Sequence, residues 1–417
     1  MEQKIYNEYV EILKEELLPA MGCTEPIAVA YAAAVAVQAL GEKPESVEVN
    51  VSANIIKNVK SVVVPCTGGL RGIGAAVCAG IVAGCPEKEL EILEEITGEQ
   101  KVEMKKMLDT MPMTIRESDK EYIFDIQIKA CAGGHSGYVE IAGFHTNVIC
   151  VKKDDEIIRE KAYEEQGSSC ATDRSLLTVE KIIEFADCVD VADVEEVLQR
   201  QIDYNWAIAE EGMTGKWGAA IGKTLMEAYG NSVHNRAKAM AAAGSDARMN
   251  GCELPVVINS GSGNQGMTTS LPVIVYAKEL NVSKEMMLRA LVVSNLITIH
   301  MKTGIGRLSA YCGAISAGCG AGAGICYLYG GRAYEISHVI VNAVAINSGV
   351  VCDGAKASCA AKIASAVEAG LLGLQMQKNG KQFYGGDGLV EKGVENTIRN
   401  IGELAKKGMR ETDKTII

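Results

Sequence analysis

The sequence predicts an α+β protein in which a mainly helical domain is interrupted by an inserted mixed α/β domain. Two observations predict this class. Towards both ends of the chain, apolar residues recur with the 3.6-residue period of a helix. From about Glu45, short β-branched runs alternate with polar residues, which is typical of strands. We therefore expect a helical domain formed by residues 1–44 and 176–417, and an inserted α+β domain at residues 45–175.

Local patterns give the expected order of the elements. "EYVEILKEELL" predicts an amphipathic helix, and an Ala-rich helix follows after Pro26. The runs "SVEVNVSANI" and "SVVVPC" predict strands, "GIGAAVCAGIVAG" a helix of small residues, and "EKELEILEEI" and "QKVEMKKML" surface helices. Further strands are expected in "YIFDIQIKAC" and "GYVEIAGFHTNVICV". From about Thr178 the pattern is helical again, to the end of the chain.

Composition excludes several classes of partner. The 53 acidic and 41 basic residues give a formal net charge of −12 without a Lys/Arg cluster, which argues against a nucleic-acid surface. The longest apolar run, from Pro26 to Leu40, is short for a bilayer span, so we interpret it as a buried helix and expect no membrane contact. The charged N-terminus lacks the apolar core of a signal peptide. Fourteen cysteines then indicate a cytoplasmic protein with free thiols and a small-molecule substrate.

The Gly-rich segment "VVINSGSGNQG" (residues 256–266) matches the dinucleotide pattern G-x-G-x-x-G after a strand-like run. We disfavour nucleotide binding because Pro272 follows shortly, where the pattern needs a helix, and because no βαβ unit is evident. Backbone N–H groups of such a loop can instead bind an anion, and Asn264 and Gln265 can add donors for a carboxylate. A purely structural turn is about as compatible with these residues.

The C-terminal third contains cysteines at intervals of seven. Cys312, Cys319 and Cys326 form one series, and Cys352 and Cys359 flank "DGAKAS". On a regular helix, seven residues rise roughly 10.5 Å, whereas a disulfide needs Cα atoms about 4.4–6.8 Å apart, so a helix here would exclude that bond. The short spacings typical of zinc and ferredoxin sites are absent. Separated cysteines can still converge on one metal site, although ordinary buried thiols are the more common outcome.

Cys23 stands in "MGCTEPIAVA", directly before an expected helix start, where Thr24 suits the N-cap and Glu25 and Pro26 the first turn. The positive end of a helix dipole lowers the pKa of a nearby thiol. Cys23 is therefore a candidate base or nucleophile, and a small buried residue in a turn is the equal alternative.

Five segments together resemble the iron–sulfur L-cysteine desulfidases, which are related to the bacterial iron–sulfur L-serine dehydratase α-chain. They are "MGCTEPIAVAYAAA", "GSDARMNGCELPV", "NSGSGNQGMTTSLPV", "LSAYCGAISAGCGAGAGI" and "CDGAKASCA", in order over essentially the whole chain. The resemblance implies a [4Fe-4S] cluster held by Cys312, Cys352 and Cys359, with one iron open to substrate, and Cys23 as catalytic base. Cys319 and Cys326 would be bystanders packed nearby.

The implied reaction is β-elimination from L-cysteine to pyruvate, ammonia and sulfide. A cluster iron with an open position is a Lewis acid, Cys23 would take the α-proton, and the loop of Ser262, Gly263, Asn264 and Gln265 would bind the substrate. No pyridoxal phosphate is expected, since no lysine is singled out for a Schiff base. Unlike the serine dehydratases, the chain ends in "ETDKTII", without a thiol that could occupy the open iron.

Two other functions stay open. One is a serine dehydratase-type deaminase, and the other a non-catalytic iron–sulfur protein for redox or oxygen sensing. The latter needs neither Cys23 nor the polar loop. We also expect the chain to form a homo-oligomer, a dimer.

Overall fold

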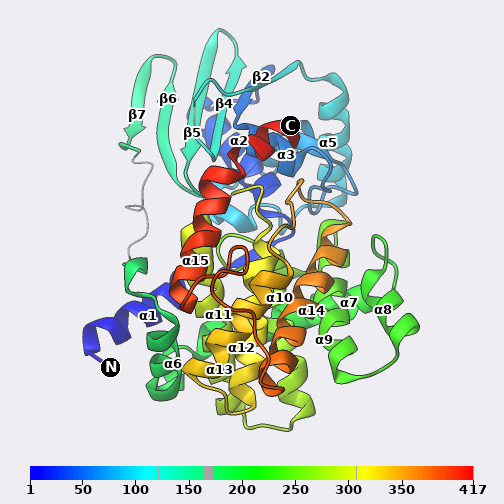
Figure 1. Ribbon diagram of the computed structural model, residues 1–417. Helices are drawn as coiled ribbons and strands as arrows, with labels where there is room; N and C mark the ends of the chain where they lie inside the picture. The colour runs from blue at the N-terminus through cyan, green and yellow to red at the C-terminus, as the bar shows by residue number, and fades with distance from the viewer. Residues whose placement is uncertain (121, 164–171, 307, 417) are drawn as a thin grey trace.

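A computed structural model describes residues 1–120, 122–163, 172–306 and 308–416. The chain forms a mixed sheet covered by helices, which we call the sheet body, and a larger group of packed helices, the helical body (Figure 1). The α+β class with mostly helical content is confirmed. Among the described helices, none is both long and apolar enough to cross a membrane.

The sheet body contains six strands in the order β3-β2-β4-β5-β6-β7. β2 and β3 run parallel, and the other neighbours are antiparallel. Alternation places Val47 and Val49 in the core and Glu48 in solvent, as a sheet with one covered face requires. The strands are β2 (Ser46–Val51), β3 (Met113–Glu117), β4 (Asp125–Ala132), β5 (His135–Ala142), β6 (Val148–Lys153) and β7 (Glu156–Glu160), and the helices are α2 (Thr24–Leu40), α3 (Ala53–Val59), α4 (Gly72–Ala83) and α5 (Gly98–Thr110).

The helix α2 packs in the core of the sheet body, although the prediction assigned residues 1–44 to the helical domain. Its backbone approaches strand β5 so closely that a Cβ at Gly137 would lie 2.1 Å from the carbonyl oxygen of Ala36. Because α2 is apolar on nearly every side, its sequence has no amphipathic face that could show which body it joins.

Two predicted elements are wrong within the sheet body. "SVVVPC" is a loop that contains an isolated bridge between Val63 and Arg71 rather than a strand. "EKELEILEEI" forms only a short 3₁₀ segment (Pro86–Glu91) followed by turns. Glu89 lies there at a φ of 45°, a left-handed conformation that interrupts a helix.

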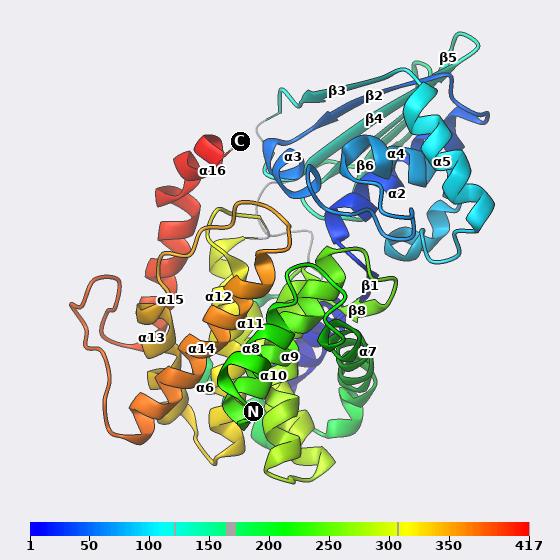
Figure 2. The same ribbon diagram turned by 90° about the vertical axis from the view of Figure 1, so that its right-hand side faces the viewer.

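The helical body is built around the adjacent helices α11 and α12, which belong to one large apolar core. Its helices are α1 (Gln3–Glu16), α6 (Val179–Cys188), α7 (Glu195–Met213), α8 (Ile221–Tyr229), α9 (Val233–Met249), α10 (Gly263–Glu279), α11 (Lys284–Ile305), α12 (Gly313–Leu328), α13 (Ala333–Ile346), α14 (Cys359–Lys378), α15 (Val394–Glu403) and α16 (Arg410–Ile416). A small sheet of β1 (Pro19–Met21) and β8 (Pro255–Val257) lies between the two bodies (Figure 2).

Small residues let α12 and α14 pack with their backbones in contact. A Cβ at Gly318 would lie 2.3 Å from the carbonyl oxygen of Ala366, and one at Gly370 would lie 2.4 Å from the carbonyl oxygen of Gly318. Cys312 is the N-cap residue of α12, and Cys359 is the first residue of α14. The close helix contact therefore fixes two of the predicted iron ligands relative to each other.

We expect Gly318→Ala to lower the free energy of unfolding by about 1–3 kcal/mol, because the added methyl group forces the two helix backbones apart. Urea denaturation measures this change. Gly98→Ala is the control, since a Cβ at Gly98 meets nothing within 4 Å. Equal stability of the two variants would contradict the close contact.

Candidate active site at the junction of the two bodies

A cavity of about 110 Å³ lies where the two bodies meet, and seven of the eight predicted site residues line it. These are Cys23, Ser262, Asn264, Gln265, Cys312, Cys352 and Cys359. The eighth, Gly263, begins α10, and a Cβ there would lie 2.4 Å from Nε of Arg248, which also lines the cavity. Segments separated by more than 300 residues in the sequence thus meet around one space.

Cys23 is the N-cap residue of α2 and is 2 % exposed. The structure does not support a lowered pKa for this thiol. Burial raises the pKa of Cys23 well above its usual value, and the nearby Glu25 carboxylate raises it further, while Arg248 opposes the shift. Desolvation disfavours the thiolate more strongly here than the helix end favours it.

Glu25 accepts hydrogen bonds from three neighbours. Its Oε2 accepts from the Cys23 thiol at 3.3 Å and from Oγ1 of Thr24 at 3.1 Å. Its Oε1 accepts from Nδ2 of Asn58 at 3.2 Å. Oγ1 of Thr24 also lies 3.0 Å from the carbonyl oxygen of Gly261, where it can donate instead. This network joins Cys23 to the Gly-rich loop and leaves the thiol facing a proton acceptor.

The Gly-rich loop starts a helix, contrary to the argument from Pro272. α10 runs from Gly263 to Glu279 with Pro272 inside it, and Ser262 is its N-cap residue. The second argument against a dinucleotide fold is confirmed, because β8 pairs antiparallel with β1 in a two-stranded sheet, not in a βαβ unit. The N–H groups at the start of α10 are therefore available to an anion in the cavity.

Arg248, on α9, is the main functional candidate that the sequence reasoning missed. Its side chain is buried, donates from Nε to the carbonyl oxygen of Gly22 at 2.9 Å, and donates from Nη1 to Oδ1 of Asn264 at 3.1 Å. It lies in "GSDARMNG", inside an Ala-rich helix. Its position after a run of small residues, "AAAGSDAR", was the available signal, since arginine is seldom fully buried without a partner.

Within the Gly-rich loop, the side chain of Gln265 also points into the protein. It is 6 % exposed, and within the described ranges its Oε1 has no hydrogen-bond partner. Its amide group lies against the backbone at Gly313, beside Cys312, where an added Cβ would come within 2.9 Å of both amide atoms. A buried, unsatisfied amide oxygen in a cavity wall is suited to a ligand that donates a hydrogen bond.

Backbone pairing holds Cys312 and Cys352 side by side. The Cys312 N–H donates to the Val350 carbonyl at 3.2 Å, and the Cys352 N–H donates to the Ala310 carbonyl at 2.6 Å. The segment at residues 352–358 is not helical, so the rise of a regular helix, considered above for the spacing of these cysteines, does not apply here. The segment forms a loop in which Gly354 has a φ of 101°, a conformation that favours glycine, and α14 begins at Cys359.

The pKa values of the three cavity thiols are shifted in different directions. The interaction between the adjacent Cys312 and Cys352 thiols lowers the pKa of Cys352 below the usual range of a thiol and raises the pKa of Cys312. Positive charge from Lys57 and Lys362 adds to the lowering at Cys352. Burial raises the pKa of Cys359. A thiolate at Cys352 is thus favoured by the local field, as metal binding requires.

Cys319 and Cys326 lie along α12 in the apolar core and do not line the cavity. Burial raises the pKa of each to about 12, so both behave as small apolar residues.

The three cysteines form a sulfur-only set of possible metal ligands. In the part of the chain that the structure describes, no three His, Cys, Asp or Glu side chains are grouped to hold one metal ion. Cys312, Cys352 and Cys359 all line the same cavity. Sulfur-only ligation by separate cysteines suits an iron–sulfur cluster, in which each iron takes its own thiolate.

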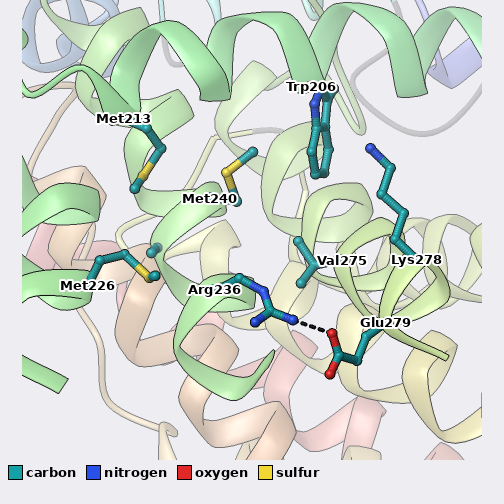
Figure 3. Close-up of a pocket in the computed structure, with 9 residues that line it drawn as sticks. Trp206, Met213, Met226, Arg236, Met240, Val275, Lys278 and Glu279 are labelled. Atoms are coloured by element: carbon teal, nitrogen blue, oxygen red, sulfur yellow. Dashed lines mark hydrogen bonds and ion pairs between the residues drawn. The ribbon is translucent and has the colours of Figure 1, made fainter. Parts of the chain in front are cut away.

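A larger cavity of about 330 Å³ lies in the helical body, away from the thiols. Figure 3 shows Arg236 directed at Glu279, with which it forms an ion pair, and Lys278 near Trp206. The Lys278 ammonium lies 3.2 Å from the Trp206 ring centroid. Most of its other lining residues are apolar, including Met213, Met226 and Met240. None of its described lining residues is a cysteine, so the smaller, thiol-lined cavity is the candidate active site.

Comparison with known proteins shows the family of the chain. A family model described as "Serine dehydratase alpha chain" matches residues 87–417. A UPF0597 protein of Desulfitobacterium hafniense is 59 % identical over 416 residues, covering 100 % of this chain and 97 % of that protein. UPF0597 proteins of Lachnoclostridium phytofermentans (50 %; 99 % of each chain) and Finegoldia magna (48 %; 99 % of this chain, 98 % of the other) are also similar.

The family match points to a dehydratase-type lyase. The chain belongs to the serine dehydratase alpha chain family. The matched range includes Arg248 and the three cysteines of the cavity wall, while Cys23 lies before it.

The raised pKa of Cys23 predicts a specific pH dependence. Because the thiol stays protonated through neutral pH, its alkylation by iodoacetamide should keep rising up to pH 9 and beyond, without a plateau. Mass spectrometry of the labelled peptide measures this, and the exposed Cys188 checks the reagent. A plateau already reached below pH 8 would show a low-pKa thiolate and contradict the structure.

Proposed function

We propose that the chain is an iron–sulfur β-elimination lyase that converts L-cysteine and water into pyruvate, ammonia and sulfide. One observation carries the proposal: three thiols, a thiol–carboxylate pair and a buried arginine line the same cavity. The thiols suit a cluster, the pair suits proton transfer, and the arginine suits a carboxylate. A redox or sensing protein needs only the first of these.

Cys312, Cys352 and Cys359 would hold a [4Fe-4S] cluster. When bound, the cluster supplies a Lewis-acidic iron with an open position for the substrate carboxylate and the leaving group. The chain contributes the surrounding positive charge of Lys362, which also holds the loop by donating to the Val351 carbonyl at 2.8 Å and pairing with Asp353.

Substrate orientation falls to Arg248 and the start of α10. A guanidinium group that is already fixed by Gly22 and Asn264 pays little entropy to bind a carboxylate. The N–H groups beginning at Gly263 add the positive end of a 17-residue helix. Gln265 offers an unpaired amide oxygen to the substrate ammonium group.

Cys23 and Glu25 would move the α-proton. At rest the thiol is neutral, so its proton must first pass to Oε2 of Glu25, with which it already shares a hydrogen bond. The thiolate then takes the α-proton and returns to the thiol, and the proton on Glu25 is available to the departing sulfur. The high pKa makes the Cys23 thiolate a strong base once it forms.

L-Serine is the alternative substrate, and it is favoured by membership of the serine dehydratase family. Sulfur is a soft ligand that suits a cluster iron, which favours cysteine. The deciding experiment incubates anaerobically purified protein containing about four irons per chain with each amino acid. We expect sulfide and pyruvate from L-cysteine at a higher kcat/KM than pyruvate from L-serine. The absence of both products would refute the lyase.

Single-cysteine variants should separate ligands from base. We expect Cys352→Ala and Cys359→Ala to lose iron and activity together. Cys23→Ala should keep its iron and absorbance but lose about 10²–10⁴-fold in turnover, as removal of a general base does. Iron analysis, spectroscopy and pyruvate release measure these effects.

Cys319→Ala is the matched control, because Cys319 is buried on α12 outside the cavity, and it should change neither iron nor rate. Ordinary activity in Cys23→Ala would exclude Cys23 as the base. Loss of iron in that variant would make it a fourth ligand.

A further inference from the structure

The C-terminal helix reaches out of the helical body to the sheet body. α16 follows α15 and ends beside α3 (Figure 2). On this helix, Asp413 accepts two hydrogen bonds: its Oδ1 accepts from Nζ of Lys57 at 2.5 Å, and its Oδ2 accepts from the backbone N–H of Ala310 at 3.0 Å. One carboxylate therefore joins the two bodies.

Both partners of Asp413 adjoin the thiol-bearing segments. The carbonyl of Ala310 accepts from the Cys352 N–H, and Ala310 precedes Cys312 by two residues. The carbonyl of Lys57 lies so close to Gly354 that a Cβ there would be 2.4 Å away. The contacts of Asp413 thus reach the segment before Cys312 and, through α3, the loop between Cys352 and Cys359.

Burial makes the Lys57–Asp413 pair costly to break. The side chain of Lys57 is 3 % exposed and that of Asp413 is 18 % exposed. Removing one partner of a shielded pair leaves an uncompensated charge, and a charged acceptor strengthens the bond from the Ala310 N–H. The neighbouring pair of Glu411 and Lys414 on the same helix is 77 % and 66 % exposed, where solvent screens it.

We propose that Asp413 is a positioning residue that ties α16 to Lys57 and Ala310 and so holds the segments carrying Cys312 and Cys352 at the junction of the two bodies. It does not line the cavity and acts through these neighbours. The importance of Asp413 for the reaction rests on the proposed function. Its effect on the stability of the backbone near Ala310 does not.

Hydrogen–deuterium exchange of the full-length, anaerobically purified protein tests this proposal. In Asp413→Ala, peptides covering residues 308–316 should exchange about tenfold faster, because the Ala310 N–H loses its acceptor and the segment opens more easily. Asp413→Asn keeps an acceptor oxygen but loses the charge, so it should show a smaller increase. Iron release to a ferrous chelator should be faster in both variants.

Glu411→Gln is the matched control, from an exposed pair on the same helix, and should match the wild type in both measurements. The proposal is wrong if Asp413→Ala exchanges at residues 308–316 within twofold of the wild type, or if Glu411→Gln accelerates equally. If Asp413→Ala does not fold, wild-type exchange in Asp413→Asn is the contradicting result. Failure of the proposed function would instead appear as wild-type protein without iron or product, whatever the exchange rates.

Discussion

The antiparallel contact between Tyr311 and Val351 is the interaction on which the site depends. Its two hydrogen bonds pair the segments before α12 and α14, so that Cys312 and Cys352 become neighbours although 40 residues separate them in the sequence. The close packing of α12 on α14 extends this register to Cys359. The same segments are contacted from the sheet body by α3 and from the C-terminus by α16, so both bodies are needed to complete the cavity wall.

The cavity concentrates charge where little water reaches. Arg248 is 3 % exposed and Cys23 is 2 % exposed, so electrostatic effects are stronger there than on the surface. The same burial keeps the Cys23 thiol neutral and leaves Glu25 as its nearest proton acceptor. Low solvation therefore determines how a proton can move in the cavity. It favours proton transfer by the Cys23–Glu25 pair over transfer to a pre-formed Cys23 thiolate.

The sequence predicted which residues gather at the cavity better than it predicted how they behave. Residue types, spacing and family resemblance pointed to Cys23, the Gly-rich loop and the three thiols, and these line one cavity. Predictions from local sequence failed where tertiary contacts determine the ionisation of a residue or the course of the backbone. Desolvation by the fold outweighs the helix dipole at Cys23, and Pro272 is accepted inside α10. Arg248 and Asp413 were missed because their partners are remote in the sequence.

The most direct measurement of the central claim is a crystal structure of the anaerobically purified protein with anomalous diffraction recorded at the iron absorption edge. We predict iron density inside the cavity at the junction of the two bodies, bonded to the sulfur atoms of Cys312, Cys352 and Cys359 and open on the side that faces Cys23 and Arg248. Iron bound elsewhere in the chain, or a cavity of intact, metal-free thiols in protein that releases sulfide from L-cysteine, would contradict it.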